Sequence, residues 1–436
     1  MIRSYRLRRI LAPTAGLARA VAITLGGLAL LFVGAGLSFK GWILPVLQWA
    51  SDQAELLARD IVPQERVEVF LWQAGGLLLL LGLIVAYRGV RSGISNVIET
   101  LNPGLKEGKV DVYLRRQQLA QGPRIVAIGG GTGLSTLLRG LKQHTSNITA
   151  IVTVTDDGGS SGKLIHEKGM MPPGDIRNCL VALADAEKSM TDLFQHRFKN
   201  DSGSLSGHSM GNLLIAALVD QARGDFEKAV ETASAVLAIR GTVVPSTLQR
   251  VRLRASMEDG REICGETAIV EAAGTIDRIY LDPDNVAAHR AAIQAIRTAD
   301  LICIGPGSVF TSILPNLMVP EIAEALREAL APRVYICNVM TQPGESDAFT
   351  ASEHAAAIVK HVEGRIIDYV MVNTGMPGED LVGKYRGSGQ AIVEPDIDRI
   401  RAMGFRVLSG NYMSETDVVR HDPMKVASRL MGLVTR

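Results

Sequence analysis

The feature that most constrains the fold is a series of short aliphatic runs, each ending in a loop rich in glycine, proline or asparagine. Runs such as RIVAI and LICIG are apolar at every position rather than at alternate positions. Such strands are buried on both faces, as in parallel sheets covered by helices on both sides. Longer helical patterns separate the runs, so the sequence predicts a doubly wound α/β fold with a mostly parallel sheet. The expected strands are 124–128, 147–154, 301–305, 333–337 and 366–372.

One segment departs from this pattern. Residues 250–280 alternate between polar and apolar side chains and contain a Glu-Asp-Gly turn. Alternation indicates strands with one solvent-exposed face, and a short turn of this kind joins antiparallel strands. We therefore expect a small antiparallel β insertion within the larger domain.

Two long apolar runs lie near the N-terminus, at 20–37 and 69–87. As helices, each would be roughly 27–29 Å long, close to the ~30 Å hydrocarbon thickness of a bilayer. A signal peptide is the alternative for the first run, but the second run and the lack of a small-x-small cleavage site before Lys40 argue against it. All three tryptophans lie in or beside this region, as is typical of membrane interfaces. The sequence therefore predicts a two-helix transmembrane hairpin.

Basic residues set the expected orientation of this hairpin. Residues 1–19 contain five arginines and no acidic residue, and the segment after the second run is also rich in lysine and arginine. The positive-inside rule then places both termini and the large domain in the cytoplasm, at the cell membrane. The predicted organisation is a basic cytoplasmic N-terminus at 1–19, a transmembrane hairpin at 20–87, a linker at 88–123 and a cytoplasmic domain at 124–436.

Charge and cysteine content exclude several other classes of protein. The chain has 46 basic and 45 acidic residues, and this net charge of +1 gives no field that would attract nucleic acid. The four cysteines are scattered and form no C-x-x-C pair. They indicate buried thiols in a reducing compartment rather than a zinc site or a disulfide framework.

The loop after the first strand is the first candidate for binding a phosphate. Gly130, Gly131, Thr132 and Gly133 lie between the strand and a helix, where glycine allows close backbone approach and the helix N-terminus attracts anions. The spacing matches neither a dinucleotide fingerprint nor a P-loop. From the residues alone, a phosphate site and a tight packing turn both remain open.

Acidic residues follow in the next two loops. Asp156 and Asp157 end the second strand beside a glycine-serine turn that contains Ser160 and Ser161, and Asp175 follows in PPGDIRN. Paired carboxylates at a strand end suit a Mg²⁺ ion shared with ligand phosphates. The alternatives are solvated turn acids that cap the next helix and, for Asp175, a helix N-cap.

Residues 207–211 match G-x-S-x-G, but a loop precedes them where a hydrolase needs a strand. We therefore expect the N-terminus of the following helix to offer Ser209, Asn212 and backbone donors to an anion. Later loops add further polar residues at strand ends, namely Gly307, Ser308, Asn338 and Thr341. Because these loops share one edge of the predicted sheet, they indicate a pocket for a phosphorylated ligand.

The motifs together carry a family resemblance. In order, the chain contains GGGTGLSTLLRGLK, TVTDDGGSSGKL, PPGDIRNCLVALAD, GHSMGNLLIAAL, GPGSVFTSILPNL, NVMTQPGES and VVRHDPMKVA. These motifs resemble the YvcK/CofD-like family, and within it the bacterial gluconeogenesis factor branch. The resemblance covers roughly 124–436 and implies a Rossmann-like fold with a site across the strand ends. The apolar runs at the N-terminus lie outside the family core.

The resemblance implies two possible roles. One branch resembles 2-phospho-L-lactate transferase, a Mg²⁺-dependent enzyme with a nucleotide-linked donor, in which Asp156 or Asp157 would hold the metal with Asp175. The other branch binds UDP-sugars such as UDP-N-acetylglucosamine and acts in cell-wall synthesis, cell shape and growth on gluconeogenic carbon. There, Tyr385 and Arg420 would serve the nucleotide sugar.

The PPGDIRN and HDP motifs favour the UDP-sugar branch, as does a membrane anchor. We further expect a homo-oligomer without a redox cofactor, and cell-wall synthesis proteins as partners. A scaffold with a vestigial pocket is the third possibility.

Overall fold

The computed structural model describes residues 40–59, parts of 63–89, and 117–434 with gaps at 187, 200–202, 273, 379–384, 386–388 and 415–418. The chain divides into two units, Met1–Gln118 and Leu119–Arg436. The second unit has its own core and contains every strand of the described residues.

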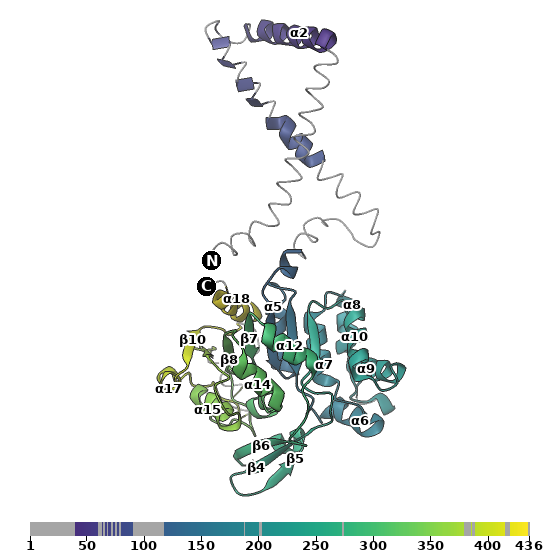
Figure 1. The fold of residues 1–436 in the computed structure, drawn as a ribbon, viewed down its shortest axis with the longest axis vertical. Coiled ribbons are helices and arrows are strands. Elements are labelled where there is room, and N and C mark those ends of the chain that lie inside the picture. Colours follow the sequence, from purple (N-terminus) through teal and green to yellow (C-terminus); the bar gives the residue numbers. More distant parts are fainter. Residues whose placement is uncertain are drawn as a thin grey trace. The chain divides into compact units, whose positions relative to one another are not determined.

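The second unit is built on a seven-stranded sheet in which all paired strands are parallel (Figure 1). Its strands are β1 (Ile125–Gly129), β2 (Ile148–Val152), β3 (Thr242–Pro245), β7 (Leu301–Ile304), β8 (Arg333–Ile336), β9 (Tyr369–Asn373) and β10 (Arg406–Gly410). The order across the sheet is β10-β9-β8-β7-β1-β2-β3. Along the chain, β2 and β3 are added on one side of β1, and β7 to β10 are then added on the other side. The strand order therefore reverses between β1 and β7.

Alternate residues of β1 enter two separate hydrophobic cores. Ile125 and Ala127 pack on one face, whereas Val126 and Ile128 pack on the other, and all four side chains are buried. The first face is covered by α5 (Gly131–Leu141), α7 (Gly174–Leu183), α9 (Met210–Gln221), α10 (Phe226–Val236) and α18 (Pro423–Val434). The second is covered by α12 (Arg290–Thr298), α13 (Leu314–Leu317), α14 (Pro320–Glu328), α15 (Ala351–His361) and α17 (Ile397–Ala402). The predicted doubly wound parallel fold is thus confirmed.

All five predicted strands are present, and the two that the sequence did not predict lie at the edges of the sheet. β3 is only four residues long and ends in Pro245, which shortens its apolar run. In β10 only Leu408 is fully buried, so the strand lacks the continuous apolar pattern of the central strands. Edge position explains both omissions, because an edge strand needs less two-sided burial.

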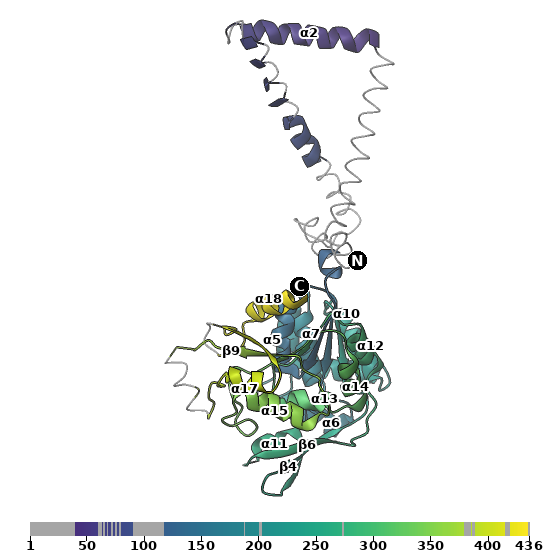
Figure 2. The ribbon, with the colours of Figure 1, turned by 60° about the vertical axis from the view of Figure 1, so that its left-hand side comes forward.

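The predicted β insertion is confirmed as a second, antiparallel sheet. It consists of β4 (Arg252–Met257), β5 (Glu262–Cys264) and β6 (Ile276–Asp282) in the order β5-β4-β6. A short helix, α11 (Glu266–Glu271), lies between β5 and β6. Figures 1 and 2 show this sheet at the end of the second unit that lies opposite α18.

The second unit begins earlier than the predicted boundary at 124. The Leu119 carbonyl accepts a hydrogen bond from the Ser146 N–H at 2.9 Å, and the Asn147 side chain donates to the carbonyls of Ala120 and Gly122. These bonds attach residues 119–123 to the loop before β2. The last part of the predicted linker therefore belongs to the folded domain.

The predicted membrane spans lie largely outside the described residues. Residues 20–37 fall wholly outside them, and 69–87 are described only in part. The first unit contains α2 (Lys40–Arg59), a 20-residue helix with Pro45 inside it. Within the described ranges no single helix has both the length and the apolar character to cross a bilayer; by those criteria alone, only the bent pair 309–317 and 320–328 passes.

The cysteine prediction is correct for three residues and wrong for one. Cys179, Cys303 and Cys337 are buried free thiols, whereas Cys264 is exposed at the end of β5. Burial raises the pKa of Cys303 well above its usual value and that of Cys337 to about 12, so both are protonated at neutral pH. Cys264 is the last residue of the three-residue strand β5 in the insertion sheet.

The contact between α5 and α18 gives a first testable prediction. A Cβ on Gly140 would overlap the Pro423 carbonyl oxygen and lie 3.0 Å from the Ala427 Cβ. Gly140→Ala should therefore lower the free energy of unfolding of a 119–436 fragment by ~1–3 kcal/mol, because the two helices must separate. Gly432→Ala is the control, since nothing lies within 4 Å of its Cβ position. There, the better helix propensity of alanine should raise the stability by ~0.5–1 kcal/mol. Urea denaturation measures both, and a Gly140→Ala fragment as stable as the wild type would contradict this packing.

Candidate functional site

A cavity of about 620 Å³ opens at the carboxyl ends of the central strands. Its walls include the loops after β1, β2, β7 and β8 together with the segment around Arg420. The strand order reverses at this point of the sheet. In open parallel sheets, ligands bind in the crevice at such a reversal, so the topology marks this cavity as the candidate site.

The N-terminus of α5 forms one wall of the cavity. Gly131, Thr132 and Gly133 line it, and the N-cap residue Gly130 makes no side-chain capping bond. Backbone N–H groups in the first turn of a helix lack intrahelical partners and, with the helix dipole, attract an anion. A Cβ on Gly133 would overlap the Pro306 carbonyl oxygen, so glycine lets the loop after β7 approach the helix.

The loops after β7 and β8 hold each other in place. The Gly307 N–H donates to Asn338 Oδ1 at 3.0 Å, and Asn338 Nδ2 donates to the Gly307 carbonyl at 2.9 Å. The Ser308 hydroxyl donates to the buried Glu345 carboxylate and accepts from the Thr311 N–H at 3.2 Å. Gly307, Ser308 and Asn338 therefore meet as predicted. Asn338 acts by fixing the loop, and Glu345 engages the Ser308 proton.

Among the described residues, four carboxyl groups line the same cavity: Asp156, Asp175, Glu266 and Glu345. Burial, and then the charge of Asp156, raises the pKa of Asp175 to about 7. Burial is also the largest cause for Glu266 and Glu345, whose pKa values rise to about 9 and about 7. Burial raises the pKa of Asp156 as well. The cavity thus concentrates acidic groups whose ionised forms are disfavoured. These groups would keep their protons or require a bound cation to ionise.

Sequence reasoning missed both glutamates. Glu345 stands in the quoted motif NVMTQPGES, but its role becomes visible only once the loop folds back onto Ser308. Glu266 lies in the β insertion, and no local pattern indicated that α11 reaches the strand ends of the main sheet.

Asp157 does not face the cavity with Asp156 and Asp175. Its carboxylate accepts from the backbone N–H groups of Glu266 and Thr267, at 3.0 and 2.9 Å, and from the Thr267 hydroxyl at 2.7 Å. It therefore caps α11, whose N-cap Gly265 has no side chain. The sequence left open that this acid caps a helix, but it indicated the next helix along the chain rather than α11.

The three predicted metal-binding acids are consequently not brought together. Within the described part of the chain, no group of three or more His, Cys, Asp or Glu side chains is placed to hold a metal. Asp175 is no N-cap, because Pro173 has that position in α7. Its carboxylate instead accepts from the Gly131 N–H, which leaves Asp156 and Asp175 as the two acids beside the candidate anion site.

Five further predicted residues bond to other groups of the domain instead of lining the cavity. Ser160 bonds His208 Nδ1 at 3.1 Å, and Ser161 Oγ accepts from the Gly174 N–H at 3.1 Å and also bonds the Asp156 carboxylate. Ser209 caps α9 by accepting from the Asn212 N–H at 3.2 Å. Thr341 Oγ1 accepts from the Ala391 N–H at 3.0 Å. None of these five residues is among the described residues that line the cavity.

The predicted pair Tyr385 and Arg420 is connected through the backbone. The Tyr385 hydroxyl accepts from the Val419 N–H at 3.0 Å, next to Arg420. Arg420 is exposed and lines the cavity, followed by the buried His421, which also lines it. Burial lowers the pKa of His421 to about 4, so this imidazole is neutral near pH 7. Tyr385 thus holds the segment that presents Arg420.

The fold and the cavity define a Rossmann-like α/β protein with a candidate anion site at its strand ends. The chain belongs to the CofD family, because residues 125–413 match the family described as 2-phospho-L-lactate transferase CofD. Within that family its relatives are gluconeogenesis factors, in agreement with the resemblance of the motifs.

Two relatives and one solved structure show how far this similarity extends. A Nostoc sp. protein is 44% identical over 429 residues, which cover 97% of this chain and 91% of that protein. The "Gluconeogenesis factor" of Bacillus subtilis is 49% identical over 317 residues, 72% of this chain and 99% of that protein. The crystal structure of a UPF0052 family member from Bacillus halodurans is 45% identical with a TM-score of 0.69, and covers 71% of this chain and 99% of that one. Almost all of that crystallised chain is matched by a portion of this chain about as long as the second unit, so we expect a 119–436 fragment to fold on its own.

The raised pKa of Glu266 gives a pH-dependent prediction. In the folded protein the pKa of Glu266 is about 9, whereas in the unfolded chain this carboxyl group has its usual pKa of 4.5. Folded molecules therefore bind more protons than unfolded ones between these values, and stability falls as pH rises through this window. Glu266→Gln removes this loss. In metal-free buffer its melting temperature should equal that of the wild type near pH 4 and exceed it increasingly up to pH 9.

The exposed Glu271 on the same helix provides the control. Glu271→Gln should change the melting temperature by the same small amount at every pH. A constant difference between Glu266→Gln and the wild type over the whole range would contradict the burial of Glu266.

Proposed function

We propose that the protein binds a UDP-sugar of the UDP-N-acetylglucosamine class and thereby regulates cell-wall synthesis, cell shape and growth on gluconeogenic carbon. The observation that carries this proposal is one cavity that contains both the N-terminus of α5 and Arg420. The helix N-terminus suits one phosphate of a diphosphate, and a guanidinium suits the other phosphate. A volume of about 620 Å³ is within the range of cofactor-sized sites.

The acidic groups of the cavity fit a divalent cation. A diphosphate beside Asp156 and Asp175 would meet like charge, and the pKa of Asp175 is already raised partly by Asp156. Mg²⁺ is usually bound through one or two carboxylates plus ligand phosphates, which matches these two acids. Asp156 and Asp175 would hold the ion, which would neutralise charge on the phosphates. The Gly131 N–H and the Ser161 hydroxyl keep the two carboxylates oriented.

The cellular role rests on the relatives and on the N-terminal sequence. The Bacillus subtilis relative is named a gluconeogenesis factor, and the Nostoc sp. relative aligns along nearly the whole chain, including the N-terminal part. We propose that 20–37 and 69–87 anchor the protein in the cell membrane, with both termini and the large domain in the cytoplasm. Anchoring would raise the local concentration of the domain near membrane-bound wall-synthesis proteins. A homo-oligomer is part of the same proposal.

A Mg²⁺-dependent transferase of the 2-phospho-L-lactate transferase type is the second candidate function. It is favoured by the name of the matched family and by the proximity of Asp156 and Asp175. In that reaction, the metal would stabilise charge that develops on the leaving phosphate of a nucleotide-linked donor. The residues of this chain would bind and orient the donor through the N-terminus of α5 and Arg420.

Arg420→Ala should weaken the binding of UDP-N-acetylglucosamine more than about tenfold, equivalent to ~1.4 kcal/mol, because a charge-assisted contact is lost. Isothermal titration calorimetry with Mg²⁺ and the 119–436 fragment measures this change. Arg401→Ala is the matched control, since Arg401 is an exposed residue of α17 that pairs with Asp398 at 3.2 Å. Unchanged affinity in Arg420→Ala would remove Arg420 from the site.

³¹P NMR of the same mixture separates the two functions. For a binding protein, the diphosphate resonances should broaden or shift, and no new species should form over hours. New phosphorus resonances that disappear in Asp175→Asn would instead identify a transferase. A spectrum unperturbed by the protein would show that the ligand class is wrong.

A further inference from the structure

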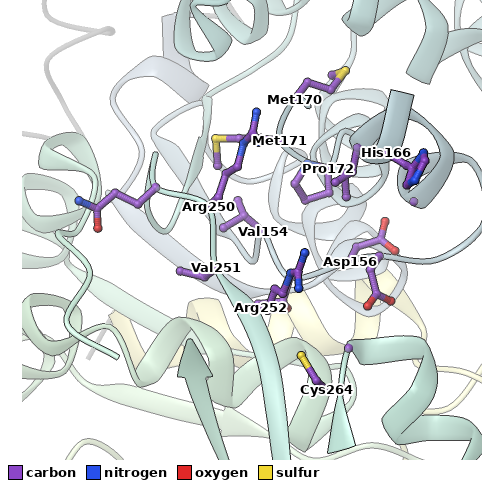
Figure 3. A pocket seen from close by; sticks show the side chains of 16 residues that line it. Val154, Asp156, His166, Met170, Met171, Pro172, Arg250, Val251, Arg252 and Cys264 are labelled. Carbon is purple, nitrogen blue, oxygen red and sulfur yellow. The ribbon is translucent and has the colours of Figure 1, made fainter. Parts of the chain in front are cut away.

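A second cavity, of about 480 Å³, lies between the main sheet and the β insertion (Figure 3). One side comes from the end of β2, from α6 (Gly159–Lys168) and from the loop that follows this helix. The other side comes from 249–252 at the start of β4 and from Cys264 and Gly265. The two cavities share only Asp156 among the described lining residues, so the second is a separate space.

Apolar side chains form a large part of the second cavity. Met170, Met171 and Pro172 lie along one side in Figure 3, and Val154 and Val251 lie between them and β4. Both methionines are 7% exposed, so they are part of the core where they line the cavity. Methionine is flexible and polarisable and makes favourable contacts with aromatic rings. The lining therefore suits the apolar or aromatic body of a small molecule.

Two arginines give this apolar space a cationic edge. Arg250 and Arg252 line the cavity, and both are exposed. The Arg250 guanidinium lies beside Gly169, the C-cap of α6, where a helix C-terminus favours positive charge. Among the described residues, neither guanidinium has a hydrogen-bond or ion-pair partner, in contrast to Arg254 on the same strand, which pairs with Asp282 at 3.4 Å.

The acidic residues of the same lining do not neutralise these arginines. Asp157 directs its carboxylate to the N-terminus of α11, where three donors bind it. Asp156 bonds the Gly158 N–H at 3.1 Å and the Ser161 hydroxyl. The two positive charges thus stay available for a ligand, and they stand beside apolar surface.

We propose that this second cavity is a binding site for a small organic anion with an apolar body, held through its phosphate or carboxylate group by Arg250 and Arg252. A guanidinium recognises either group through paired N–H donors. The volume is within the 300–1,000 Å³ range of small-molecule sites. Because Asp156 belongs to both linings, this ligand would lie beside a residue that also lines the first cavity.

Cys264 supplies a reporter for occupancy of the second cavity. Its side chain lines the cavity and is exposed, whereas Cys179, Cys303 and Cys337 are buried. A neutral reagent such as iodoacetamide should alkylate Cys264 selectively in the folded 119–436 fragment, as its thiolate displaces iodide. A molecule in the cavity should block this reaction.

Naphthyl phosphate, an aromatic anion, is the probe. It should slow alkylation of Cys264 at least about fivefold at saturation, measured as a rate by mass spectrometry, and neutral naphthol should protect more weakly. In the double variant Arg250→Ala/Arg252→Ala, the concentration for half-protection should rise at least about tenfold, since charge-assisted contacts are lost.

Arg261→Ala is the matched control, because Arg261 is an exposed arginine of the insertion that pairs with Asp259 at 2.7 Å and does not line the cavity. In this variant, naphthyl phosphate should protect Cys264 from alkylation as it does in the wild type. Three results would each overturn the proposal: no protection of the wild type, equal protection by naphthol, or unchanged half-protection in a double variant with a wild-type melting temperature. Because the reporter is the thiol and not nucleotide-sugar binding, the outcome does not depend on the proposed function.

Discussion

The burial of β1 on both faces is the constraint on which the rest of the second unit depends. Its alternate side chains enter two different cores. On one side it pairs with β2, the next strand in the sequence, and on the other with β7, which comes much later in the chain. This arrangement leaves an opening where the connections after β1 and β7 diverge. The N-terminus of α5, directly after β1, then lines that opening, and its N-cap residue Gly130 has no side chain to cap the helix. The position of the first cavity, as a candidate anion site, follows from the topology before any individual side chain is considered.

Around this opening, electrostatics set the chemistry. Backbone donors and Arg420 supply positive potential, while Asp156, Asp175, Glu266 and Glu345 supply a larger number of acidic groups. Burial disfavours their ionised forms, as the raised pKa values of these four groups indicate. As we propose, such a set of acidic groups would suit a ligand that carries its own cation. Mg²⁺ with a nucleotide diphosphate would be such a ligand.

The sequence predicted those features that depend on local pattern. The five central strands, the antiparallel insertion and the glycine-rich start of α5 are each encoded within a few adjacent residues. Gly131, Gly307, Asn338 and Arg420 were predicted for the site, and they do line the cavity. The roles of Asp157, Glu266 and Glu345 depend instead on contacts between segments far apart in the chain. Asp157 caps a helix that starts 109 residues later, and no periodicity or spacing within one segment encodes such a contact.

The cap that Asp157 provides has a consequence for how this architecture can diversify. Helix α11 carries Glu266 into the first cavity, while the two strands before it, β4 and β5, carry Arg252 and Cys264 into the second. One carboxylate at the end of β2 thus sets the position of a wall that the two cavities have in common. A change in the length or sequence of the insertion alters both ligand environments at once. Independent adaptation of either cavity is therefore confined to the loops of the main sheet.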